Sequence, residues 1–236
     1  MKLQLVIRRA PAKAGLEWIK QGWLLMRSQI LLLLMFWVML SVSLLGLLHP
    51  LLAVIAALLG PFLLAGFYDG IVRVQQQQSI TLAMLWQPLQ EGAHRVAFIR
   101  LAGVNILFSI PSQLLLQQQI PLWEAGQPDL LALFALVALA AVNAMLFAYA
   151  VPVIYFLREQ RLWPVLQASF MACWRNVPAL TLFGVLSVVL GLTGPLTMLI
   201  SWILVLPWLS ISFFLSFREF FVLTPARPDE ATIFEV

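Results

Sequence analysis

The stretch LLALFALVALAAVNAMLFAYAVPVIYFL, residues 130–157, contains no charged residue. About 20 apolar residues are enough for a helix to cross the hydrocarbon core of a bilayer. This run is longer, so it predicts a transmembrane helix that is tilted, kinked or protruding. Five further uncharged apolar runs lie at residues 30–48, 51–68, 101–116, 177–192 and 196–217. The sequence therefore predicts an all-α, polytopic integral membrane protein with six transmembrane helices.

The composition excludes most other classes of protein. Of the 236 residues, 62% are hydrophobic and only 10% are charged, whereas an average soluble domain has about 45–50% apolar and about 25% charged residues. Neither a soluble globule nor a disordered chain fits these values, and a single cysteine excludes a disulfide scaffold. The net charge of +4 is explained by membrane topology, so we expect no nucleic-acid partner.

The distribution of Lys and Arg predicts the orientation, because cytoplasmic loops retain positive charge. All 14 basic residues lie before the first run, between the second and third, between the fourth and fifth, or after the sixth. The loops on the other side have none, and the segment 117–129 carries only Glu124 and Asp129. We therefore expect a multi-pass protein with both termini in the cytoplasm and no cleavable signal peptide.

The chain divides into a membrane domain, residues 1–223, and a tail at 224–236 that we expect to be mobile and cytoplasmic. Three units, at 10–78, 79–160 and 161–224, each begin with a stretch of mixed polarity and continue with two apolar runs. Two explanations stay open: three helical-hairpin repeats, or the generic composition of a cytoplasmic membrane border. The stretches 12–27 and 82–96 are amphipathic, and we expect interfacial helices there.

Three short motifs carry a resemblance to a known family. They are the segment from Ala12 to Lys20 (AKAGLEWIK), the glycine-rich second apolar run from Gly60 to Arg73, and the segment from Ala172 to Asn176 (ACWRN). With these motifs the chain resembles an uncharacterised, BPSS-type family of proteobacterial inner-membrane proteins, known as a domain of unknown function. The resemblance implies a six-helix protein of the bacterial inner membrane, and it supplies no catalytic residues.

Residues that could carry catalysis are few and separated. His49 belongs to a turn on the outer side, whereas His94 belongs to a cytoplasmic stretch, with Glu91 as its only nearby acid. We expect the Glu91–His94 pair to be a solvated contact and the lone Cys173 to be a small buried hydrophobic residue. A zinc site needs three or four clustered ligands, and the sequence has no such cluster. We predict no catalytic site, no metal site and no cofactor.

The candidate functional residues are therefore binding residues. Arg73, Arg158 and Arg218 follow aromatic helix ends, and Trp18 and Trp23 lie in the first amphipathic stretch. We expect these five residues to contact anionic lipid headgroups on the cytoplasmic side or a protein partner, which could be another membrane protein or a second copy of the chain. The sequence thus favours a scaffold or accessory membrane protein over an enzyme, including a lipid-modifying one.

An alternative function rests on polar residues inside the apolar runs, which are costly unless they are satisfied. Asn105 and Asn143 are the strongest such residues, and Pro61, Pro111, Pro152 and Pro207 interrupt the runs. A transporter or channel for a small solute or lipid would have both asparagines at one polar site. Hydrogen bonding between helices is the simpler explanation of the same residues.

The predicted topology can be tested with single cysteines at Gln76 and Gln127 in a chain whose Cys173 has been replaced. We expect an impermeant thiol reagent applied to intact cells to label the cysteine at position 127, because that loop lies outside. The cysteine at position 76 should react only after the cells are opened. The reverse labelling pattern would invert the orientation.

Overall fold

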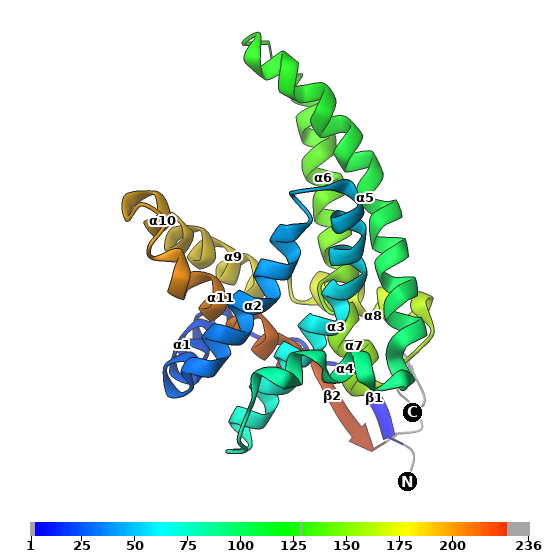
Figure 1. Ribbon diagram of the computed structural model, residues 1–236, viewed down its shortest axis with the longest axis vertical. Helices are drawn as coiled ribbons and strands as arrows, with labels where there is room; N and C mark the ends of the chain where they lie inside the picture. Colours follow the sequence, from blue (N-terminus) through cyan, green and yellow to red (C-terminus); the bar gives the residue numbers. More distant parts are fainter. Residues whose placement is uncertain (1–2, 128, 226–236) are drawn as a thin grey trace.

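The computed structural model describes residues 3–127 and 129–225, and it is mostly helical (Figure 1). Five helical segments are long and apolar enough to cross a membrane, namely Pro50–Gln75, Gly92–Glu124, Leu130–Leu157, Val177–Leu196 and Trp202–Phe220. A sixth is present if the pair Ala14–Ser28 and Ile30–Leu45, bent by 101°, counts as one. The prediction of a helical protein with several membrane-spanning segments agrees with this finding.

The elements follow one another in this order along the chain: β1 Leu3–Ile7, α1 Ala14–Ser28, α2 Ile30–Leu45, α3 Pro50–Gln75, η1 Leu82–Trp86, α4 Gln87–Gln90, η2 Gly92–His94, α5 Arg95–Glu124, α6 Leu130–Phe147, α7 Ala150–Leu157, α8 Leu162–Arg175, α9 Val177–Gly191, α10 Thr193–Leu196, α11 Trp202–Phe220 and β2 Phe221–Pro225. The η elements are single 3₁₀ turns.

Three hairpins project from a common base and fan apart (Figure 1). The α5–α6 hairpin extends toward the top of the view, the α9–α11 hairpin toward the left, and the α2–α3 hairpin lies between them. The outer parts of the hairpins expose large apolar side chains, and α6 has no buried residue at all. In water this surface would be unfavourable, so the hairpins are suited to a lipid environment.

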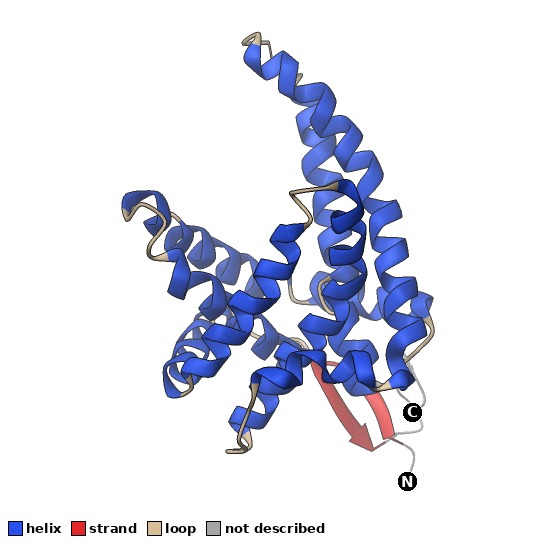
Figure 2. Cartoon of the chain, in the orientation of Figure 1, coloured by secondary structure: helices blue, strands red, loops and turns tan. Residues whose placement is uncertain are grey.

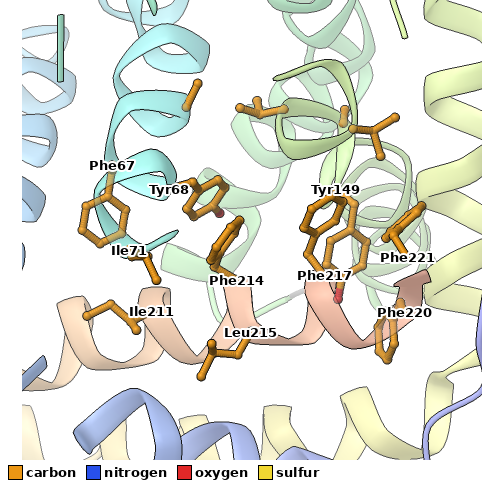
Figure 3. Close-up of a cluster of buried hydrophobic side chains, with 14 of the residues drawn as sticks. Phe67, Tyr68, Ile71, Tyr149, Ile211, Phe214, Leu215, Phe217, Phe220 and Phe221 are labelled. Atoms are coloured by element: carbon orange, nitrogen blue, oxygen red, sulfur yellow. The ribbon is translucent and has the colours of Figure 1, made fainter. Parts of the chain in front are cut away.

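The core lies at the base, where aromatic side chains of three segments meet (Figure 3). The Tyr149 ring, between α6 and α7, stacks on Phe213 of α11 with 5.1 Å between ring centroids. Its hydroxyl lies 2.7 Å from Ser216 Oγ, which satisfies the polar end of a buried ring. The Tyr68 ring of α3 stacks on Phe214 at 4.4 Å. These contacts join α3, the α6–α7 junction and α11.

Helix α1 packs across α11 and α9 through small residues. A side chain at Gly22 would collide with Ser212 of α11, and one at Gly15 would lie 2.6 Å from the Ala179 carbonyl oxygen of α9. The Trp208 indole of α11 also donates to the Ile19 carbonyl at 2.7 Å. α1 is therefore packed against other helices of the protein through the face that carries Gly15 and Gly22.

A two-stranded antiparallel sheet joins the two ends of the described chain at the base (Figure 2). β1 pairs with β2 from Leu3 opposite Pro225 to Ile7 opposite Phe221. The sequence predicts no strand and a mobile tail that starts at Thr224, yet Thr224 and Pro225 belong to β2. That boundary was wrong, and residues 226–236 lie outside the described residues.

Two other expectations need correction. The stretch 82–96 is not one amphipathic helix. It is divided into the short elements η1, α4 and η2, and the backbone of Glu91 is extended between the last two. The predicted outer loop 117–129 is mostly helix, since α5 continues to Glu124. Of the three explanations left open for the long run 130–157, an interruption is present: α6 ends at Phe147 and α7 starts at Ala150, and Pro152 has no N–H to offer the Ala148 carbonyl.

The α1–α11 crossing yields a stability prediction. Gly22→Ala should lower the melting temperature in mild detergent, because forcing a methyl group into a filled contact costs about 1–3 kcal/mol. Gly184→Ala is the matched control: Gly184 lies in α9 with nothing near its Cβ position, so alanine should be neutral or slightly stabilising there. Circular dichroism during heating measures both, and equal melting temperatures would contradict the packing described for α1.

Candidate functional site

A polar groove lies at the base between the N-terminal half of α1, the last residue of α3 and the C-terminal end of α11. Its volume is about 480 Å³. Its polar lining consists of Lys13, Glu17, Gln21, Gln75, Arg218 and Glu219. We call this the α1 groove. It brings one cation and one carboxylate from the start of α1, and one of each from the end of α11, into one hollow.

Trp18 and Glu219, which both line the groove, are joined by a hydrogen bond. The Trp18 indole N–H donates to Glu219 Oε2 at 2.6 Å, and its ring packs edge-on against Phe220 at 5.4 Å. Only 2% of Trp18 is exposed. The prediction that Trp18 contacts lipid headgroups is therefore wrong, because the packing of α1 on α9 and α11 buries the ring. Its role is to hold the carboxylate of Glu219.

Trp23 lies five residues after Trp18 on the same helix, and its surroundings are different. It is 37% exposed and lies beside Trp208, with 5.0 Å between ring centroids. Leu16 and Leu24 are exposed on the same side of α1. This side has the apolar surface that is expected of an interfacial helix, and Trp23 stays a candidate for lipid contact.

Arg73, at the C-terminal end of α3, belongs to a chain of polar side chains. Its Nε donates to Asp69 Oδ2 at 2.9 Å and its guanidinium to Gln87 Oε1 at 3.4 Å. Gln87 in turn donates to Glu91 Oε1 at 2.9 Å. Arg73 is thus partly buried and committed to the α3–α4 junction, so a lipid phosphate would compete with Asp69 for it.

Arg158 follows α7 with a backbone φ of +56° and an exposed side chain, so it is accessible from outside. Beside it, Glu159 accepts two hydrogen bonds from the Arg161 guanidinium, which holds the pKa of the Glu159 carboxyl below its usual value. Arg218, at the end of α11, is likewise exposed and lines the α1 groove. The three arginines end three different helices and do not form a single cluster.

His94 is buried, contrary to the expected solvated contact with Glu91. Only 6% of His94 is exposed, and its ring lies edge-on to Tyr155 at 5.5 Å between centroids. Among the described residues, its Nδ1 has no hydrogen-bond partner. No group of three or more His, Cys, Asp or Glu residues that could hold a metal occurs in residues 3–127 and 129–225.

One cavity of the described residues contains Asn105 but not Asn143. Asn105 lines a cavity of about 250 Å³ between α3, α5 and the α6–α7 segment, together with Pro61 and Phe147. Its Oδ1 lies 3.4 Å from Ser109 Oγ. Asn143 does not line this cavity, and its buried Oδ1 has no partner among the described residues. A polar site shared by both asparagines stays a prediction, and this cavity contains only the first of them.

The acceptors of the α1 groove were missed as candidate residues. Neither Glu219 nor Gln75 is among the candidate residues that the sequence predicts. Local sequence carries no signal that α1 lies over both helix ends. Lys13 and Glu17 lie one turn apart, but Gln75, Arg218 and Glu219, which line the same groove, come from 58 or more positions away in the sequence.

The chain was compared with models of protein families, with curated proteins and with solved structures, and none of the three comparisons found a match.

The Trp18–Glu219 contact can be tested by removing the donor alone. Trp18→Phe keeps an aromatic ring but leaves the carboxylate without its partner, which should cost about 1–3 kcal/mol and lower the melting temperature. Trp174→Phe is the control, because Trp174 is 65% exposed and should change little. A Trp18→Phe protein as stable as the parent would show that the hydrogen bond contributes nothing.

Proposed function

We propose that this chain is a multi-pass protein of the bacterial inner membrane that acts by contact, as a scaffold or accessory subunit that binds lipids and partner proteins at its cytoplasmic face. The observation that carries the proposal is the segregation of the surface. The charged assemblies around Arg73, Arg158 and Arg218 all lie at helix ends of the base, whereas the hairpins that project from it expose apolar side chains.

The orientation of this proposal follows the distribution of charge. Arg73, Arg158 and Arg218 lie at or just after the C-terminal ends of α3, α7 and α11, and both described chain ends meet at the base. Basic residues favour the cytoplasmic side, so we place the base in the cytoplasm. Each basic residue near an anionic leaflet contributes about 1 kcal/mol of attraction, and salt weakens it.

The order of elements supports the threefold repeat as a part of this proposal. Each hairpin is preceded by short helical elements at the base: α1 before α2–α3, η1 to η2 before α5–α6, and α8 before α9–α11. Three hairpins built in this way present three helix ends with an arginine to one membrane face. Such an arrangement suits a protein that holds several neighbours, since the binding surface is spread over the base.

A second candidate function is a transporter, favoured by the cavity at Asn105. Pro61 lies inside α3 and removes a hydrogen bond to the carbonyl of Ala57, which also lines the cavity. A free carbonyl and an amide at one intramembrane site are the groups that transporters use to bind solutes. Uptake of solute by reconstituted vesicles, abolished by Asn105→Leu, would favour this function over the scaffold.

The contact model is tested by charge reversal. Arg158→Glu and Arg218→Glu should each reduce the anionic lipid and the proteins that co-purify with the full chain in mild detergent, because a reversed charge repels phosphate. Arg73→Glu should also weaken the α3–α4 junction, so its effect should include a lower melting temperature. Native mass spectrometry measures the lipid, and protein level is recorded for each variant.

Three replacements that remove reactive groups serve as the controls. His49→Asn keeps an acceptor at the N-cap of α3, where His49 Nδ1 accepts from Leu51 N–H. His94→Leu suits its aromatic surroundings, and Cys173→Ala suits a buried thiol. All three should leave lipid and protein co-purification, and the phenotype of the cell, unchanged. Loss of function in a well-expressed, correctly inserted variant of this set would favour an enzyme.

A further inference from the structure

The cavity at Asn105 lies between helices of the α2–α3 and α5–α6 hairpins, above the base in the view of Figure 1. Its volume is about 250 Å³, and apart from Asn105 every described residue that lines it has an apolar side chain. A charged group would lose its hydration there without gaining a counter-charge. A mostly apolar cavity with one well-placed polar side chain is typical of a site for an uncharged small ligand.

The cavity is closed on the side of the base and open on the side of the lipid. Phe98 lies one turn nearer the base than Ala102, which lines the cavity. Its buried ring meets the buried ring of Phe62 edge-on, with 5.0 Å between centroids. On the outer side, the lining residue Ile106 is 37% exposed and Val54 of α3 is 50% exposed. A ligand therefore reaches this cavity from the bilayer and not through the base.

The polar groups of the cavity lie within the apolar part of a membrane-spanning segment. Arg100 is the last charged residue before that part of α5, and at about 1.5 Å per residue Asn105 lies about 7.5 Å further along the helix. Lipid tails offer no hydrogen bond at such a depth. A polar group of a ligand that enters here is consequently satisfied by the protein or not at all.

Two polar groups of the cavity are available to a ligand, and they have opposite characters. The Asn105 amide has two N–H donors, while the contact that Ser109 Oγ makes with it, at 3.4 Å, is to Oδ1. Pro61 has no N–H to offer the carbonyl of Ala57, one turn earlier in α3, and both residues line the cavity. The site thus has a donor on α5 and an acceptor on α3. A single hydroxyl satisfies both, whereas an ether or a carbonyl only accepts.

We propose that this cavity binds an uncharged, lipid-soluble alcohol, whose hydroxyl accepts from the Asn105 amide and donates to the Ala57 carbonyl. The volume corresponds to about eight groups of the size of a water molecule. It holds the hydroxyl and the first part of an apolar chain, and the rest of the chain leaves past Ile106 toward the lipid. The inference goes beyond the proposed function, because it shares with it only the placement of the hairpins in a membrane.

The test uses the full chain in phospholipid vesicles and a photoreactive dodecanol with a diazirine in its apolar chain. Irradiation should attach the probe to peptides of α3 and α5 at the cavity, which mass spectrometry of the digested protein identifies. Dodecanol should displace the probe about fivefold better than methyl dodecyl ether, because the ether cannot donate and one hydrogen bond is worth roughly that factor. Dodecane should compete less well than the ether.

Two outcomes of this experiment would overturn the proposal. Equal displacement by dodecanol and dodecane would show that the cavity takes the acyl chains of ordinary lipids. Labelling that avoids the peptides of α3 and α5 would place the alcohol elsewhere on the protein.

Two variants remove the two polar groups one at a time. Asn105→Leu has nearly the same size but no donor, so it should lower labelling about fivefold. Pro61→Ala returns an N–H to the Ala57 carbonyl, so dodecanol should lose its advantage over the ether. The matched controls are Asn143→Leu and Pro111→Ala, an asparagine and a helix-interior proline that do not line the cavity. Both controls should label like the parent.

The outcomes also separate this inference from the proposed function. Labelling that falls with Asn105→Leu, and stays unchanged with Arg158→Glu and Arg218→Glu, supports the alcohol site whatever the base binds. If Asn105→Leu and Pro61→Ala both label like the parent and keep its preference for dodecanol over the ether, the cavity is not an alcohol site and the contact model stands. Uptake of a water-soluble solute that Asn105→Leu abolishes would make the cavity part of a transport pathway and would overturn the proposal.

Discussion

The close approach of α1 to α11 is the contact on which the base depends. Gly22 allows the two helices to touch at Ser212, and the Trp18 indole then reaches Glu219 at the end of α11. Because α1 and α11 are the first and last helices of the described residues, their crossing closes the base, as the β1–β2 pair also does. Without it, neither the α1 groove nor the surface around Arg218 would exist.

The base and the hairpins are stabilised by different environments. At the base, aromatic rings are buried against each other, as Tyr149 is against Phe213, and the Tyr149 hydroxyl is paired with Ser216 Oγ. Along the α5–α6 hairpin most side chains face outward, so the surrounding lipid takes the place of a protein core. The charged side chains are consequently concentrated where the helices end, which is also where the candidate sites lie.

Some of the candidate residues could be predicted from the residues beside them in the sequence. Arg73, Arg158 and Arg218 were recognisable because basic residues beside aromatic helix ends have a known preference for one membrane border. Whether each is available to a ligand was not recognisable: Arg73 is engaged by Asp69, whereas Arg158 is exposed. The same holds for Trp18 and Trp23, two similar residues on one helix, of which only the second faces outward.

The sequence by itself determined the class of protein, the number and positions of the apolar runs and the helix of the first amphipathic stretch, because hydrophobicity and helical period are properties of neighbouring residues. Only the tertiary structure decided which face of α1 is buried, that η1, α4 and η2 replace one helix, and that β1 pairs with β2 across more than 210 residues. It also placed Lys13 and Glu219 in one groove. Such features arise where segments distant in sequence touch, and no local pattern encodes which segments those are.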